Sequence, residues 1–188
     1  MLLTGQRENE IGALCWSEIN FDKDVISLSG SRTKNGLPHD VPMSGSVRKI
    51  LKRHKKTEGR EFVFGYAEGP FSGWSKSKER LDKQILEARK EAAKNAGGDP
   101  SKVQPLDHWT IHDLRRTVST KMGDIGIPPH VVEAVLNHIS GHKGGVAGVY
   151  NKSLYTAEKA QALARWAEYV TAVVEGRKSK VLKFSQRT

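Results

Sequence analysis

The chain has 188 residues, enough for one well-filled domain or a domain with a small appendage. Its 31 lysines and arginines against 21 aspartates and glutamates give a net charge of +10, which favours a polyanionic partner. The single cysteine excludes a disulfide framework and a CxxC zinc site, a composition typical of intracellular proteins. No apolar run approaches the roughly 20 residues of a membrane span, so we expect no membrane partner.

Short helices and extended segments are predicted to alternate in the N-terminal part of the sequence. Apolar spacing predicts a short helix over residues 8–14. Residues 24–43 are predicted to form two extended segments joined by a tight turn at residues 35–36, as a β-hairpin or small sheet. Ser44 or Ser46 can cap the next helix, whose solvent face is strongly cationic.

The remainder is predicted to be helical. A long polar helix is expected over residues 74–96, with Leu81, Ile85 and Ala88 as a narrow buried stripe. Further helices are expected to begin near Thr110, at Pro128 and Pro129, and near Thr156, the last one ending at Glu175 with inward positions Leu163, Ala164, Ala167, Val170 and Val174.

Two segments are predicted to be flexible, the glycine-rich segment 140–148 and the basic tail 176–188. The predicted fold class is therefore α+β and mainly α: a helical domain over residues 1–175 with a small antiparallel β-sheet or hairpin near its N-terminus.

The most specific local motif is His112-x-x-Arg115 at the start of a predicted helix. The two side chains are three residues apart and share one helical face, and the helix N-terminus adds its own positive potential. Such a site can hold a phosphate. Taken alone the motif is weak, because short motifs match by accident and His112 could equally be a capping or core histidine.

Four more candidates accompany this motif in a fixed linear order. Arg7 begins the first helix, Lys34 lies at the tip of the hairpin, His138 ends a helix, and Tyr150 follows the glycine-rich segment. This order, with the His-x-x-Arg motif between Lys34 and His138, resembles the tyrosine recombinases of the phage-integrase family. The stretch that begins at Tyr150 resembles prophage and genomic-island integrases in particular. The resemblance spans residues 4–174.

The resemblance implies DNA strand cleavage and rejoining through a covalent 3′-phosphotyrosyl intermediate, with no metal and no cofactor. The transition state carries extra negative charge on two non-bridging phosphate oxygens. Arg7 and Arg115 would clamp these oxygens with bidentate hydrogen bonds. Glu10 resembles the acidic residue that orients the first arginine.

The other candidates would move protons or form the covalent bond. His112 and His138 can hydrogen-bond the phosphate, and either can shuttle a proton near neutral pH. Lys34 would protonate the departing 5′ oxygen. Tyr150 would be the nucleophile. Tyr155 is its one serious rival, and the distance from His138 favours Tyr150.

Metal-dependent chemistry is the natural alternative. A two-metal nuclease needs several converging carboxylates, and the sequence shows no such group. Two histidine pairs, His108 with His112 and His138 with His142, have the spacing of zinc ligands on a helix. The first pair lacks the glutamate of H-E-x-x-H, and the second pair runs into the glycine-rich segment, where helical geometry should fail.

Three functions stay open at this level: the catalytic domain of a site-specific recombinase, a non-catalytic DNA-binding remnant or regulator, and a type IB topoisomerase-like enzyme. The resemblance implies double-stranded DNA with att-like sites as the partner, and a homotetramer on paired sites, with a monomer as the alternative for the isolated chain. It also implies accessory DNA-bending proteins and a cytoplasmic, nucleoid-associated location. Full-length relatives carry an upstream core-binding domain that this sequence lacks, so we expect weak DNA affinity from this chain alone.

Overall fold

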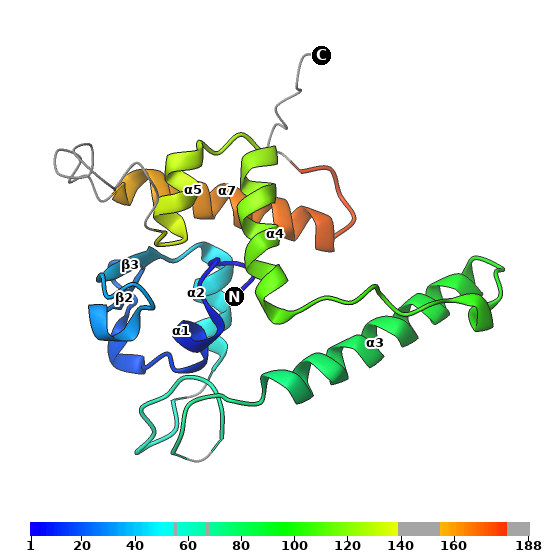
Figure 1. Ribbon diagram of the computed structural model, residues 1–188, viewed down its shortest axis with the longest axis horizontal. Coiled ribbons are helices and arrows are strands. Elements are labelled where there is room, and N and C mark those ends of the chain that lie inside the picture. The colour runs from blue at the N-terminus through cyan, green and yellow to red at the C-terminus, as the bar shows by residue number, and fades with distance from the viewer. Residues whose placement is uncertain (55, 67, 139–154, 180–188) are drawn as a thin grey trace.

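The computed structural model describes residues 1–54, 56–66, 68–138 and 155–179 (Figure 1). Its three strands are β1 (Ile19–Asn20), β2 (Val25–Leu28) and β3 (His39–Pro42), paired antiparallel in the order β1-β2-β3. Helices make up most of the described chain, so the prediction of a mainly helical α+β fold with a small antiparallel sheet is confirmed.

The described helices lie close to their predicted positions. Ser44 caps α2, since its hydroxyl accepts the backbone N–H of Val47 at 3.4 Å, and Thr110 and Asp113 form a capping box at the start of α4. The helices are α1 (Glu8–Gly12), α2 (Gly45–Arg53), α3 (Trp74–Asn95), α4 (Ile111–Asp124), α5 (Pro129–Val135) and α7 (Thr156–Val174), with 3-10 turns η1 (Trp16–Glu18), η2 (Gly30–Arg32) and η3 (Pro100–Lys102).

Helix α7 is the centre of the packing, in contact with β3, α2, α4 and α5. Its Trp166 is fully buried, and the indole N–H donates to the carbonyl of Leu2 at 2.7 Å. Leu14, Met122 and Leu136 fill the same hydrophobic core from other parts of the chain. The core therefore ties the first residues of the chain to its last helix.

The connection between β2 and β3 is longer than the tight turn that the sequence predicts. Residues 29–38 separate the strands and include η2. Arg32 anchors this loop, because its guanidinium donates to the carbonyl of Ala13 and to Glu18 at 2.8 Å. The Asn-Gly signal indicated a two-residue hairpin, but these side-chain contacts hold a wider loop in place.

The apolar stripe predicted on α3 is not buried, and this expectation is wrong. No residue of α3 is buried, and Leu81 is 40% exposed. Figure 1 shows α3 extending away from the rest of the molecule, with the returning chain beside it. We call residues 74–109 the α3 arm. The stripe lacks a covering layer because helix α3 packs mainly against η3 and the returning chain, both within the arm itself.

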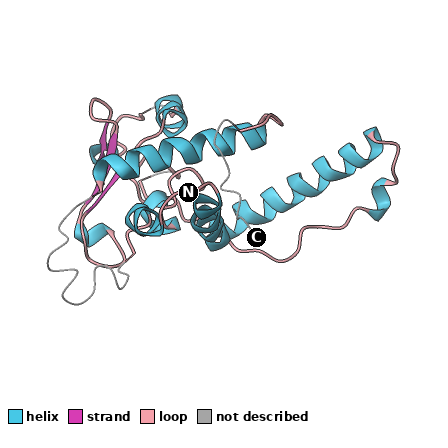
Figure 2. Ribbon diagram, turned by 90° about the horizontal axis from the view of Figure 1, so that it is seen from above, coloured by secondary structure: helices cyan, strands magenta, loops and turns pink. Residues whose placement is uncertain are grey.

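The inward face predicted for α7 is confirmed at Leu163 and Ala167, which are buried, and at Val170, which packs against the core, and it is wrong at two positions. Ala164 is exposed, and Val174 is 80% exposed. The buried positions are Lys159, Ala162, Leu163, Trp166, Ala167 and Ala172. In the last turn of α7, Val173 and Val174 face solvent while Ala172 is fully buried. Figure 2 shows the helices and loops around this part of the molecule from above.

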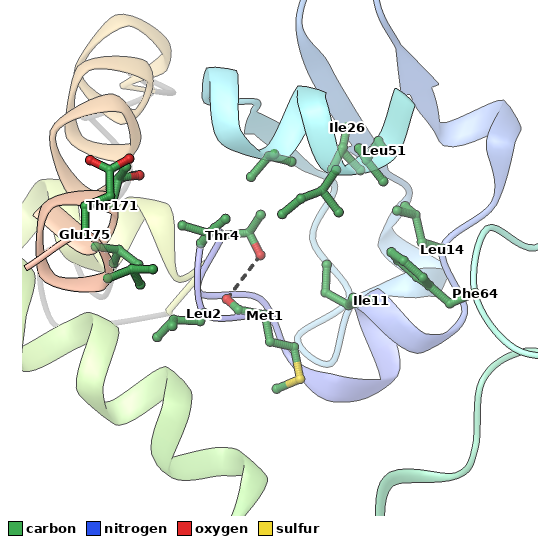
Figure 3. A pocket seen from close by; sticks show the side chains of 15 residues that line it. Met1, Leu2, Thr4, Ile11, Leu14, Ile26, Leu51, Phe64, Thr171 and Glu175 are labelled. Carbon is green, nitrogen blue, oxygen red and sulfur yellow. Dashed lines mark hydrogen bonds between the residues drawn. The ribbon is translucent and has the colours of Figure 1, made fainter. Parts of the chain in front are cut away.

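An apolar cavity of about 440 Å³ lies beside the chain's first residues, between α7, α2 and α1 (Figure 3). Its lining includes Leu2, Ile11, Leu51 and Phe64. A phosphate would find almost no hydrogen-bond donors there, so this cavity does not fit the chemistry that the sequence predicts.

His39 makes the stability of the fold depend on pH. Burial, aided by the positive charge of Lys159, lowers the pKa of His39 from 6.5 to about 4. The neutral ring donates from Nε2 to the carbonyl of Val135 at 3.1 Å. Between these two pKa values the unfolded chain binds a proton at His39 and the folded chain does not, so the stability is full above pH 6.5 and falls as the pH drops toward 4.

We expect His39→Gln to remove this pH dependence while keeping a donor for the carbonyl of Val135. The loss attributable to His39 is about 3 kcal/mol across the window. Urea unfolding at a series of pH values measures it, with the exposed His108→Gln as the control. A wild-type pH dependence in the His39→Gln variant would contradict the assignment.

Candidate active site

A polar pocket of about 520 Å³ lies between α1, the β2–β3 loop and the start of α4. Arg7, Lys34 and His112 line it together. The three residues come from segments that are far apart in the sequence. The structure therefore brings three of the predicted catalytic side chains to one pocket, and all three can carry positive charge.

Arg7 is held by Glu10 at the start of α1. The Arg7 guanidinium donates to Oε1 of Glu10 at 3.0 Å, and the Arg7 backbone N–H donates to Oε2 at 2.9 Å. Glu10 is only 3% exposed, so its carboxylate is rigidly placed. An orienting role for Glu10 would require such contacts, and the role itself stays a prediction.

Arg115 lies one turn after His112 but, unlike His112, is buried, with 3% of the residue exposed. Its two terminal nitrogens donate to the backbone carbonyls of Gly5 and Leu136. Burial, together with the nearby charge of Arg7, lowers the pKa of Arg115 to about 10, so the side chain stays charged at neutral pH. Arg115 is not among the residues that line the pocket.

His138 follows the end of α5, where the chain leaves the helix through Asn137. The ring Nδ1 lies 3.4 Å from the carboxylate of Glu133. Partial burial and the charge of Arg115 lower the pKa of His138. The imidazole is therefore neutral at pH 7 and can accept a proton.

The carbonyl groups at the end of α5 hold several of these segments together. The carbonyl of Val135 accepts hydrogen bonds from Gln6 and His39, at 2.9 and 3.1 Å. The carbonyl of Leu136 accepts one from Arg115. The carbonyl of Asn137 accepts one from Asn35 at 2.7 Å. We call these three consecutive carbonyls the α5 hub.

The α5 hub involves residues for which the sequence predicts no role in catalysis or binding. Gln6 precedes Arg7, Asn35 follows Lys34, and Asn137 precedes His138. Their position next to a predicted catalytic residue is the one local signal that could have found them. Helix ends leave carbonyls without intrahelical partners, and here other segments of the site supply the donors.

The model of the phage integrase family matches residues 1–155. The chain belongs to the phage integrase family. Prophage integrase IntA from Escherichia coli is 31% identical over 176 residues, which are 93% of this chain and 38% of that protein.

Solved structures of integrases share the fold of this family member. The Tn1549 transposon integrase in complex with a circular intermediate DNA has a TM-score of 0.58 at 21% identity, over 74% of this chain and 48% of that one. The integrase from mycobacterium phage Brujita has a TM-score of 0.55 at 16% identity, over 100% of this chain and 50% of that one. The integrase chain thus spans half or less of the length of these proteins.

Tyr150, the predicted nucleophile of this integrase, lies outside the described residues, so its role stays a prediction. Its rival Tyr155 is described and precedes α7 with a φ of 47°. The Tyr155 ring packs against His130, with ring centroids 5.3 Å apart. This contact is consistent with a packing role for Tyr155.

In the part of the chain that the structure describes, no three His, Cys, Asp or Glu side chains gather as metal ligands, and none of the helices there has the length and apolar character of a membrane span. Of the two histidine pairs with zinc-ligand spacing, the second includes His142, which lies outside the described residues.

Proposed function

We propose that this chain is the catalytic part of a site-specific DNA recombinase, which cleaves and rejoins strands through a phosphotyrosyl intermediate. The observation that carries the proposal is the convergence of Arg7, Lys34 and His112 on one polar pocket. Membership of the phage integrase family supports it. So does the proximity of Arg115 and His138 to Arg7, whose positive charge contributes to the lowered pKa of both side chains.

The proposed reaction is a reversible transfer of a DNA phosphoryl group. The phenol oxygen of Tyr150 attacks phosphorus, a P–O bond to tyrosine forms, and the P–O5′ bond breaks. The neutral His138 takes the phenol proton, and the Lys34 ammonium gives a proton to the departing 5′ oxygen. Rejoining runs the same steps backward, with the 5′ hydroxyl as the nucleophile, so no external energy source is needed.

The arginines stabilise the charge that develops in the transition state. Arg7 lines the pocket with its guanidinium already oriented by Glu10. Arg115 is charged and buried beside it, and low-polarity surroundings strengthen its field at the phosphate. His112, at the second residue of α4, adds a hydrogen-bond donor supported by the helix N-terminus.

The proposed partner is double-stranded DNA with att-like sites. The net charge of +10 and the basic side chains of α2 supply a surface for the phosphate backbone. The Tn1549 relative is described in complex with DNA. We further propose a homotetramer on paired sites, assisted by DNA-bending proteins, and action in the cytoplasm, where bacterial DNA resides.

A library of nicked duplexes with randomised sequence tests the function, because the target sequence itself need not be known. Adducts that survive denaturing detergent are recovered, and the attached DNA is sequenced. The proposal expects one recurring sequence motif among the adducts. Salt-sensitive binding without any adduct would indicate a non-catalytic DNA-binding protein, and relaxation of a plasmid that lacks the motif would indicate a topoisomerase-like enzyme.

We expect Glu10→Gln to slow adduct formation about tenfold or more, because misorienting a catalytic side chain is costly. Glutamine keeps the size of the side chain but loses the charge that holds Arg7. Rates are measured on the selected duplex with enzyme in excess. Glu58→Gln, a change at an exposed loop residue, is the control. Equal rates for both variants would rule out an orienting role for Glu10.

A further inference from the structure

Two asparagines join the loop that carries Lys34 to the end of α5, across 102 residues of sequence. The side-chain amide of Asn35 donates to the backbone carbonyl of Asn137 at 2.7 Å. The amide of Asn137 donates in return to the side-chain oxygen of Asn35 at 3.2 Å. Each partner is the immediate sequence neighbour of a predicted catalytic residue, Lys34 or His138. We call this contact the asparagine pair.

Asn137 ends α5 in a backbone conformation that favours glycine, so its side chain calls for a separate explanation. Asn137 has a φ of 49°, in the left-handed region. The N–H of His138 donates to the carbonyl of Glu133 at 3.0 Å, and that of Asn137 donates to Ala134 at 3.3 Å, a Schellman arrangement. Glycine meets this backbone requirement best. An asparagine at this position supplies an amide that glycine lacks, and here that amide reaches Asn35.

Asn35 also organises the loop around Lys34. Its side-chain oxygen accepts the N–H of Leu37 at 3.1 Å, while the hydroxyl of Thr33 donates to the carbonyl of Leu37 at 2.8 Å. The amide of Asn137 also points at that carbonyl, at 3.4 Å. Asn35 therefore makes hydrogen bonds both within the loop, to Leu37, and to the α5 hub, at the carbonyl of Asn137.

We propose that Asn35 and Asn137 are positioning residues that fix Lys34 relative to His138. The inference rests on the proposed function, in which Lys34 protonates the 5′ oxygen and His138 takes the tyrosine proton. Both proton transfers accompany the same phosphoryl transfer. Lys34 and His138 must therefore keep a fixed position relative to each other while DNA is bound. The asparagine pair supplies that link by direct hydrogen bonds, and neither asparagine is among the residues that line the polar pocket.

The first test is Asn137→Gly, which keeps the left-handed backbone and the carbonyl of residue 137 but removes the amide. We expect single-turnover adduct formation on the selected duplex to slow by about 10- to 100-fold, since small misplacements at a reacting group have effects of this size. The half-saturating DNA concentration should change by less than about twofold, because the phosphate contacts remain. An unchanged rate would overturn the proposal.

A double-mutant cycle with Lys34→Ala separates positioning from general weakening of the fold. If Asn137 acts through Lys34, Asn137→Gly should slow the Lys34→Ala variant by less than about twofold. The same loss in both backgrounds would show a merely structural role. Asn35→Asp provides a second route, because it keeps the acceptor oxygen but removes the donor to the carbonyl of Asn137.

Hydrogen exchange tests the pair even where no adduct forms. We expect Asn137→Gly to speed exchange of the Leu37 amide about tenfold or more relative to wild type, while exposed Arg116→Lys leaves it unchanged. Wild-type protection of Leu37 in Asn137→Gly would overturn the asparagine pair. If the wild-type chain forms no adduct but Asn137→Gly still speeds exchange of the Leu37 amide, the proposed function is refuted and the asparagine pair is not.

Discussion

Tyr150→Phe is expected to abolish the covalent protein–DNA adduct, with a loss of at least about a thousandfold. Phenylalanine keeps the ring but removes the oxygen that would bond to phosphorus. The described residues that line the polar pocket include no tyrosine, serine or cysteine that could replace Tyr150 as the nucleophile. The measurement is adduct yield on the selected nicked duplex.

Tyr155→Phe is the matched control for this experiment. It removes a phenol oxygen only five residues away and keeps the ring that packs against His130. We expect its adduct yield to stay within about twofold of wild type. An adduct in Tyr150→Phe that disappears in Tyr155→Phe would assign the nucleophile to Tyr155 instead.

Arg115→Lys is expected to slow adduct formation at least about a hundredfold and to lower the melting temperature. The guanidinium donates through two nitrogens to the carbonyls of Gly5 and Leu136 at once. A lysine ammonium is a single point of charge, so one buried carbonyl would lose its partner, which costs about 1–3 kcal/mol. Activity and stability should therefore fall together.

Arg116→Lys is the control at the neighbouring position. Arg116 side-chain atoms are 73% exposed, and the guanidinium pairs with Asp113 at 2.8 Å on the surface. We expect the change there to leave the melting temperature unaltered, because exposed ion pairs contribute little. Thermal unfolding of Arg115→Lys and Arg116→Lys under the same conditions compares their melting temperatures. Equal melting temperatures for them would contradict the buried double contact of Arg115.

Local sequence signals predicted the elements well where a cap or a periodic pattern defines them. The Ser44 cap and the capping box at Thr110 act over three or four residues, so the sequence contains the whole interaction. The stripe on α3 failed because periodicity reports that one helix face is apolar and cannot report what covers it. The same limit applies to Ala164 and Val174 of α7, which were predicted to face inward and are exposed.

The candidate site was only partly predictable for a similar reason. The resemblance identified Arg7, Lys34 and His112, and the structure places them in one pocket. The buried contacts of Arg115 and the asparagine pair join residues more than 20 and 100 positions apart, and no local pattern encodes such partners. The Asn35-Gly36 turn signal was misread because the asparagine side chain serves a distant carbonyl as well as the loop.

The α3 arm lies outside the hydrophobic core, so the need to keep the core packed does not constrain its sequence. It contributes no buried residue, while α2, α4, α5 and α7 share a continuous core. Substitutions along the arm therefore leave the free energy of folding of the body largely unchanged. Natural selection can act on the arm for what it contacts, and it need not also preserve there the packing that keeps the catalytic residues together.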